Sequence, residues 1–349
     1  MFKNLMKKDF NIVQKFPLLI LVSILIICGG LIHVLAFGLN IGIDYEGGAK
    51  IEIELAGDYS EKSDFKADFE EYFTNFINSN GYNVVDKMQV SPLLEGGSTY
   101  EFRLAYELNG KKIGKSEEEQ VAFMESLQGP QTNKDNMGFQ GVLEEEILKF
   151  FTDKEMEEEF VEGCVKANII GASSSKSLTR ATFIAIALAL VAILVYIMIR
   201  FTVSSGLAAI CGLAHDVLIM IALTAIFQIP VNTTFIAAVI TIIGYSINSS
   251  IVIFDKVREC KKSAAFALAS DEEIANYAIK HSFVKIALSI LTTLIMVVAL
   301  VLFSVSTIQE FILPIIFGLL AGTFSALCLN PSIWVLFKKV GAKRKSKKA

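Results

Sequence analysis

The sequence predicts a polytopic α-helical membrane protein with six transmembrane helices and one α+β extracytoplasmic domain after the first helix. The chain is 53% apolar, and its mean hydropathy of +0.53 is high for a soluble protein of this length. Its apolar residues gather in runs of about 20, the length that crosses a hydrocarbon core roughly 30 Å thick. A long polar segment with strand and helix patterns separates the first run from the second.

Six apolar runs are long enough to span a bilayer. The predicted spans are Leu18–Phe37, Leu178–Ile199, Gly206–Phe227, Thr233–Phe254, Val284–Phe303 and Phe311–Phe337. The first run is too long for the apolar region of a signal peptide, and Ala36-Phe37-Gly38 is a poor cleavage site, so we interpret it as a retained signal anchor. The last run is long enough to tilt in the membrane.

The distribution of positive charge predicts that both termini are cytoplasmic. Lysines precede the first span in the N-terminal segment 1–17, and Lys and Arg fill the tail 338–349. The loop between spans four and five is also basic, whereas the short loops 228–232 and 304–310 contain no Lys or Arg. This is the positive-inside pattern, and it places the segment 40–176 outside the cytoplasm.

The extracytoplasmic segment is strongly acidic. It contains 28 Asp and Glu residues against 13 Lys and Arg, so its formal charge is −15. We expect this charge to keep the domain soluble and away from anionic headgroups, with an acidic docking face as the alternative. It argues against nucleic acid as a partner. Of five cysteines only Cys164 lies in this segment, and no Cys or His spacing indicates a metal or other cofactor site.

Periodicity within the external segment predicts a small α+β sandwich. Alternating patterns predict strands at Ala49–Leu55, Tyr82–Val90 and Thr99–Tyr106. Asp64–Ile77 is expected to be a helix whose stripe of phenylalanines packs on the sheet as core; they are Phe65, Phe69, Phe73 and Phe76. A strand–helix–strand–strand order suits one layer of sheet covered by helix.

The rest of the external segment is less patterned. Residues 107–163 form a Glu-rich insertion, in which Glu117–Leu127 and Val142–Val161 are candidate helices. Ala172–Ser177 is small and Ser-rich, and we expect it to be a linker that returns the chain to the membrane. Six spans with one external domain after the first also suggest half of a pseudo-symmetric transporter.

Polar residues within the spans are candidates for ion coupling, because polar groups are costly at bilayer depth. Span three contains His215-Asp216 on the side of a small-residue face. The pair is either a proton-carrying site or a structural contact, and the sequence favours neither.

Spans four and five carry further polar candidates. In span four Tyr245 and Asn248 share one face and Ser249 lies beside it, where interhelical hydrogen bonding is favoured over a polar relay. In span five Lys285 either snorkels to the cytoplasmic interface or meets a carboxylate inside the bundle. The motif Gly318-x-x-x-Gly322, followed by Ser325, is interpreted as a close-packing face of span six.

The sequence contains no Walker motif, no Gly-x-Ser-x-Gly and no HExxH, so ATP hydrolysis and the common hydrolase reactions have no support. Energy for any transport step must therefore come from an ion gradient or from a partner. A membrane-embedded enzyme that uses His215 and Asp216 is disfavoured, since no nucleophile or metal partner has suitable spacing.

Several motifs together resemble those of the SecD/SecF family of bacterial protein-export subunits, on its SecF side. The run Gly42-Ile-Asp44-Tyr-Glu-Gly47-Gly48 is similar to a signature that SecD and SecF share. Leu213-Ala-His215-Asp216-Val217 resembles the SecF third span, and Leu291-Thr-Thr-Leu294 resembles the fifth. The stretch Phe235–Asn248, followed by Ile251–Glu259 with Asp255 and Arg258, is very similar to the most distinctive SecF segment.

The resemblance implies half of a resistance–nodulation–division (RND) superfamily bundle that pairs with a SecD subunit and with the SecYEG channel. It implies use of a proton or sodium gradient to help move unfolded exported polypeptides across the bacterial cytoplasmic membrane. The chain departs from the family pattern at Ser249, where an Asp is usual, and at Lys285, where an Arg is usual. We therefore expect the essential carboxylate on the SecD partner, rather than at Asp216. Alternatives are an RND-type exporter of lipids or small hydrophobic molecules, and a passive assembly subunit.

Overall fold

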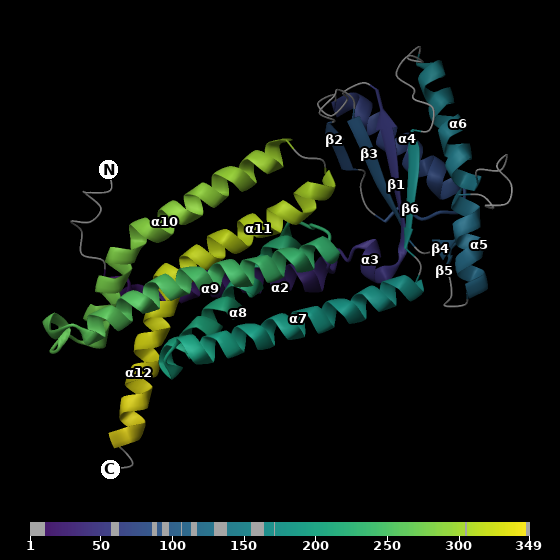
Figure 1. The fold of residues 1–349 in the computed structure, drawn as a ribbon. Coiled ribbons are helices and arrows are strands. Elements are labelled where there is room, and N and C mark those ends of the chain that lie inside the picture. Colours follow the sequence, from purple (N-terminus) through teal and green to yellow (C-terminus); the bar gives the residue numbers. More distant parts are fainter. Residues whose placement is uncertain are drawn as a thin grey trace. The chain divides into compact units, whose positions relative to one another are not determined.

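The structure is a computed structural model that describes residues 11–56, 63–85, 89–92, 98–105, 107–112, 117–128, 138–154, 164–170, 172–303 and 306–346. It divides into two compact units (Figure 1). One is a bundle of long helices, and the other is an α+β unit between Ile41 and Phe183. The N-terminal lysines Lys3, Lys7 and Lys8 and the end of the basic tail lie outside the described residues.

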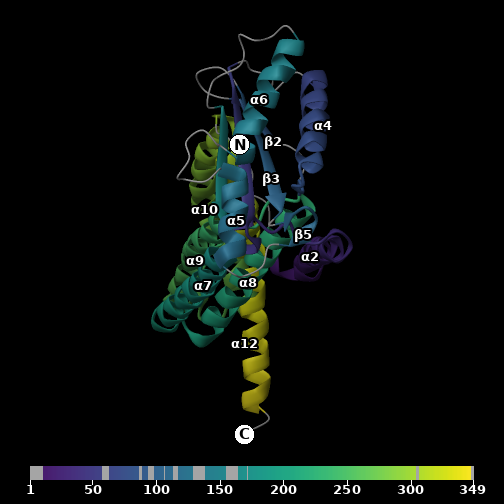
Figure 2. The same ribbon diagram turned by 90° about the vertical axis from the view of Figure 1, so that its right-hand side faces the viewer.

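The long helices confirm the membrane class. They are α2 (Phe16–Phe37), α7 (Ala172–Arg200), α8 (Val203–Ile226), α9 (Thr233–Lys262), α10 (Asp271–Phe303) and α11 (Ser306–Phe324). Helix α11 continues through the π-helical turn η4 (Ser325–Leu329) into α12 (Asn330–Ser346). Short 3₁₀ turns η1 (Val13–Lys15) and η3 (Ala264–Phe266) precede α2 and α10. Six helical stretches of 24 to 34 residues are long and apolar enough to cross a membrane, with mean hydropathies of 2.0 to 2.9. In Figures 1 and 2 the last turns of α12 extend beyond the other helices of the bundle.

Burial separates central from peripheral spans. About half of the most apolar window is buried in α8 (50%), in α9 (50%) and in the α11–α12 span (56%), against 11%, 6% and 17% in the spans of α2, α7 and α10. Close approach between helices depends on glycine. A Cβ on Gly318 would lie 2.5 Å from Ile242 of α9, and one on Gly30 of the peripheral α2 would lie 2.4 Å from Ala222 of α8. The peripheral helices present exposed Leu, Ile and Val side chains, as expected for lipid-facing surfaces.

The α+β unit has one four-stranded antiparallel sheet. Its strands are β1 (Gly48–Leu55), β2 (Gln89–Pro92), β3 (Ser98–Ala105) and β6 (Val165–Ile170), in the order β2-β3-β1-β6. A separate two-stranded pair joins β4 (Glu107–Leu108) to β5 (Lys111–Lys112). The helices are α3 (Ile43–Glu46), α4 (Ser63–Ser79), α5 (Glu117–Gln128) and α6 (Gly138–Asp153).

The two faces of the sheet differ, as an alternating pattern requires. Ile51 pairs with Phe102 on β3 and with Ala167 on β6, and these side chains join the core against α4, α5 and α6. The other face carries cross-strand ion pairs, including Lys50–Glu101 at 2.9 Å and Lys166–Glu54 at 2.5 Å. The predicted phenylalanine stripe is confirmed as core: Phe69 and Phe73 are fully buried, and Phe65 and Phe76 pack against them.

Several predicted elements need correction. The expected strand Tyr82–Val90 is wrong in its first half, where the described residues form only an isolated bridge between Val84 and Leu104. Gly81, with φ +89°, turns the chain after α4. Tyr82 then packs into the core with its ring centroid 4.4 Å from that of Phe139, so its apolar character reflects the helices rather than a strand.

Two further predictions were wrong, one in the type of element and one in where a helix ends, and one strand was not predicted. Ala172–Ser177 is not a linker but the first turns of α7, because serines fit the open end of a helix. The helix expected at Val142–Val161 is α6, which ends at Asp153; residues 155–163 lie outside the described part. Strand β6 was missed because its short, mixed sequence becomes a strand only by pairing with β1.

Candidate functional site

A buried carboxylate connects four elements of the helix bundle. Asp216 on α8 is 1% exposed. Its Oδ2 atom accepts hydrogen bonds from the hydroxyls of Ser246 on α9 and Ser325 on η4, the latter at 2.8 Å. Its Oδ1 atom lies 2.9 Å from Nδ1 of His215, and Nε2 of that ring lies 2.8 Å from the hydroxyl of Ser23 on α2. We call these five residues the Asp216 cluster.

Small residues and an irregular turn make this cluster possible. A Cβ on Gly322 would lie 3.3 Å from the side chain of Ser246 and 3.6 Å from Oδ2 of Asp216, so any larger side chain would press on the carboxylate. Ser325 begins the π-helical turn η4. Such turns shift side chains around a helix and often occur at functional sites.

A second set of polar groups lies beside the cluster. Asn330 donates to the hydroxyl of Ser250 at 2.8 Å, and Ser250 donates to the main-chain carbonyl of Ser246 at 3.2 Å. Asn330 occupies the space that a side chain on Gly212 would need, since a Cβ there would lie 2.0 Å from Oδ1 of Asn330. The hydrogen bond between α12 and α9 therefore depends on glycine at position 212 of α8.

The other predicted candidates lie apart from Asp216. Tyr245 donates to the carbonyl of Ser289 at 3.1 Å and lies 3.0 Å from the hydroxyl of Thr293, which ties α9 to α10. Ser249 is buried, but the α9 hydroxyl that binds Asp216 is that of Ser246, one turn earlier. Asn248 and Lys285 are exposed on the surface of the single chain.

The family-signature residues have structural roles that the geometry explains. Gly47 and Gly48 have φ angles of +80° and +142°, and a Cβ on Gly48 would lie 2.4 Å from the carbonyl oxygen of Leu104. Gly42 immediately precedes the short helix α3, which contains Asp44 and which Gly47 ends. Near the end of α9, Asp255 pairs with Arg258 at 3.3 Å and with Arg200 of α7 at 2.5 Å.

The arrangement suits proton exchange or helix fixation rather than bond making. The imidazole of His215 has a hydrogen-bond partner at each ring nitrogen, and the carboxylate beside it has three donors. Such a pair can hold a proton on either member while its hydrogen bonds persist. Within the part of the chain that the structure describes, no group of three His, Cys, Asp or Glu side chains is placed to hold a metal ion.

Sequence patterns identified His215 and Asp216 but missed three of the residues that surround them. Ser23 lies in a span interpreted only as an anchor, Ser246 was not singled out, and Ser325 was assigned to close packing alone. Glycines 318 and 322 do permit close packing, as expected. A useful signal would have been that the first, fourth and sixth spans each contain a serine in an apolar run. A serine hydroxyl is costly in lipid without a hydrogen-bond partner, so such serines are candidates to bind a carboxylate in a neighbouring span.

The fold and the cluster define a multi-pass membrane protein with an α+β unit after the first helix and a buried carboxylate among the described residues of its helix bundle. The family model described as protein export membrane protein SecD/SecF, C-terminal, matches residues 153–340, more than half of the chain. The chain therefore belongs to the SecD/SecF family.

Individual relatives agree with this assignment. The protein translocase subunit SecDF of Bacillus subtilis is 29% identical over 337 residues, covering 95% of this chain and 38% of the relative. The SecF subunit of Sebaldella termitidis is 37% identical over 191 residues, covering 53% of this chain and 60% of the relative. The crystal structure of SecDF from Thermus thermophilus superposes with a TM-score of 0.69 at 23% identity, covering 96% of this chain and 39% of that one. The chain thus spans less than two thirds of each of these relatives, from 38% of the Bacillus subtilis SecDF to 60% of the Sebaldella termitidis SecF.

Proposed function

We propose that this chain is the SecF-type half of a SecD–SecF pair that promotes export of unfolded polypeptides through the SecYEG channel. The observation that carries the proposal is the family match over the membrane helices, combined with relatives named as protein translocase subunits. Relatives named SecDF and SecF support an association with a SecD subunit. By the same proposal the protein lies in a bacterial cytoplasmic membrane with both termini in the cytoplasm.

Energy for the movement comes from the transmembrane ion gradient, and the essential carboxylate lies on the SecD partner. Position 249 is a serine, which cannot exchange a proton near neutral pH. Lys285 and Asn248 are exposed on α10 and α9 within a predominantly apolar surface. Polar groups in membrane helices usually face other helices or a water-filled path. These two residues therefore support a partner surface there, with Lys285 opposite an acidic residue.

Co-purification tests the pairing. The cytoplasmic tail is tagged, membranes are solubilised in mild detergent, and co-purifying proteins are identified by mass spectrometry. We expect a SecD-like chain together with channel subunits. A homo-oligomer with no such partner would contradict the proposal and would favour an RND-type exporter of lipids or small hydrophobic molecules.

Substitution of Lys285 tests the partner carboxylate. We expect Lys285→Gln to lower gradient-dependent export by roughly tenfold and Lys285→Arg to retain it, because the positive charge is the shared property. Export is measured in inverted vesicles with and without the ion gradient. His281→Gln is the control, since His281 is exposed on the same helix but bonds its own backbone at Tyr277.

An unchanged export rate in Lys285→Gln, with SecD still bound, would contradict the role of Lys285. If the ion gradient also had no effect on export by the wild-type protein or by any variant, a passive assembly subunit would describe this chain better than a subunit that uses the gradient.

A further inference from the structure

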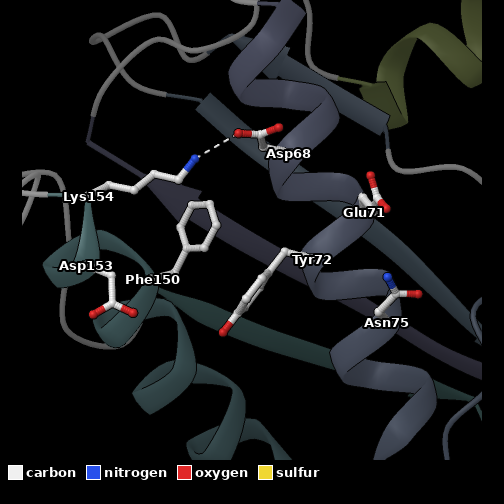
Figure 3. Close-up of a pocket in the computed structure, with 7 residues that line it drawn as sticks. All are labelled: Asp68, Glu71, Tyr72, Asn75, Phe150, Asp153 and Lys154. Carbon is white, nitrogen blue, oxygen red and sulfur yellow. Dashed lines mark hydrogen bonds and ion pairs between the residues drawn. The ribbon is translucent and has the colours of Figure 1, made fainter.

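The α+β unit contains a pocket between α4 and α6 that none of the membrane functions above uses. Its volume is about 530 Å³, and its lining residues are Asp68, Glu71, Tyr72, Asn75, Phe150, Asp153 and Lys154. Figure 3 shows Tyr72 pointing from α4 toward α6, and Lys154 reaching to Asp68. All seven residues belong to the same compact unit.

The floor of the pocket is aromatic and firmly packed. Phe150 is 6% exposed, and its ring centroid lies 5.0 Å from that of Tyr72. The hydroxyl of Tyr72 donates to Glu146, which raises the pKa of the phenol to about 12. This hydrogen bond and the ring contact with Phe150 tie Tyr72 of α4 to α6. The rings form a preformed apolar surface rather than one that a ligand must organise.

The rim of the pocket is acidic. The lining contains three carboxylates, those of Asp68, Glu71 and Asp153, and one ammonium group, that of Lys154, so its formal charge is −2. Among the described residues Glu71 and Asp153 take part in no ion pair, whereas Asp68 pairs with Lys154.

Lys154 shows what chemistry the pocket accepts. Its Nζ atom lies 3.0 Å from Oδ2 of Asp68 and 4.8 Å from the centroid of Phe150. An ammonium group is thus held between a carboxylate and the face of an aromatic ring, the geometry of a cation–π site. The chain's own lysine fills part of this site, and the carboxylates of Glu71 and Asp153 remain for a second cation.

We propose that this pocket binds a short extended polypeptide segment in which a Lys or Arg adjoins an apolar side chain. The cationic group lies on the acidic rim that Glu71 and Asp153 form at the two sides of the pocket, and the apolar group packs on Tyr72 and Phe150 between them. Charge complementarity favours a basic segment, and the aromatic floor favours an apolar neighbour over a small free amine. That the segment belongs to an exported chain rests on the function proposed above.

Binding is measured on the full chain in lipid nanodiscs by fluorescence anisotropy. The probe is a short Gly- and Ser-rich peptide with one Lys-Phe pair, and the matched peptides replace its Lys with Glu or its Phe with Gly. We expect the Lys-Phe peptide to bind best and to weaken at high ionic strength. Equal binding of the Glu-Phe peptide would overturn the proposal.

Variants assign the binding to the pocket. Each of Glu71→Gln and Asp153→Asn should raise the Kd about threefold, and both together about tenfold, because exposed ion pairs contribute modestly and nearly additively. Glu145→Gln removes an exposed α6 carboxylate that does not line the pocket, and its Kd should not change. An unchanged Kd in the double variant would overturn the proposal. A rise in Kd in Glu145→Gln as large as that in Glu71→Gln or Asp153→Asn would overturn it as well.

Lys154→Met gives an opposite prediction that loss of folding cannot imitate. Removal of the resident ammonium frees Asp68 and the face of Phe150, so the Lys-Phe peptide should bind about threefold more tightly. Weaker binding would show that Lys154 contacts the ligand instead of competing with it, which contradicts the site as proposed.

The two proposals fail separately. Peptide binding as expected in a chain that lacks a SecD partner would leave the pocket standing and remove the export function. Co-purification with SecD and gradient-dependent export, without selective peptide binding, would leave the export function standing and remove the peptide-binding pocket.

Discussion

Asp216 is the one carboxylate below one tenth exposed among the described residues of the membrane helices. Its contacts with Ser246, Ser325 and His215 give each carboxyl oxygen a hydrogen-bond partner, as a buried polar group requires. The same contacts join α8 to α9 and to η4. At the scale of the residue, the cluster holds helices together whether or not it carries an ion.

Two substitutions at Asp216 separate charge from hydrogen bonding. Asn keeps an acceptor for the two hydroxyls and should lower the free energy of unfolding by about 1 kcal/mol. Leu leaves three donors without an acceptor and should cost about 3 kcal/mol or more. Thermal unfolding in detergent measures both.

We expect Asp216→Asn to leave export largely intact, because the essential carboxylate is proposed to lie on the SecD partner. Complete loss of gradient-dependent export at normal expression would contradict that placement of the carboxylate.

Strand β6 shows how a single element depends on its neighbours. It lies at an edge of the sheet and pairs with β1 from Val165 to Ile170. Cys164, just before it, is 1% exposed and packs in the core of the α+β unit. Burial raises the pKa of this thiol to about 12, with a further contribution from the charge of Glu144. The reactive thiolate is therefore scarce at any physiological pH.

Alkylation of Cys164 should report the docking of β6. At pH 8 a membrane-impermeant maleimide should label native Cys164 at under about one hundredth of the rate for a free thiol. The neutral thiol stabilises the fold below pH about 9, and this contribution should be lost as pH rises toward 12. Cys164→Ser identifies the labelled site by mass spectrometry. Rapid labelling of the folded protein at pH 8 would show that β6 is not held on the sheet.

The whole molecule consists of two units with separate cores. The α+β core gathers residues from β1, β3, α4, α5 and α6, whereas the described bundle has its own clusters along α8, α9 and α11. Cores that share few residues unfold separately as a rule. The fold of the larger SecDF neighbour shows that such a chain can form part of a longer one.

Hydrogen exchange in increasing urea should reveal two transitions. Amides of β1 and β3 should lose protection together at one urea concentration, while those of α8 and α9 retain it, because lipid or detergent surrounds the bundle. The two sets are compared in the same nanodisc sample by mass spectrometry. A single transition for both would contradict independent units.

The sequence by itself determined the membrane spans, the order of the first strands and the aromatic face of α4. These features depend on local composition and periodicity, which neighbouring residues show directly. It also identified His215 and Asp216, because a charge in an apolar run is rare. Tyr82 and the serines in the first turns of α7 were misassigned because their local patterns suit two structures equally.

Only the tertiary structure decided which groups surround Asp216. Ser23 and Ser325 lie 192 residues before His215 and 109 residues after Asp216. Serine is common in membrane helices, so its residue type alone does not predict such a contact. The tertiary fold likewise placed Lys154 over Phe150 and joined β6 to β1. Contacts between distant segments depend on how helices and strands pack, and periodicity within one segment carries no information about its partner.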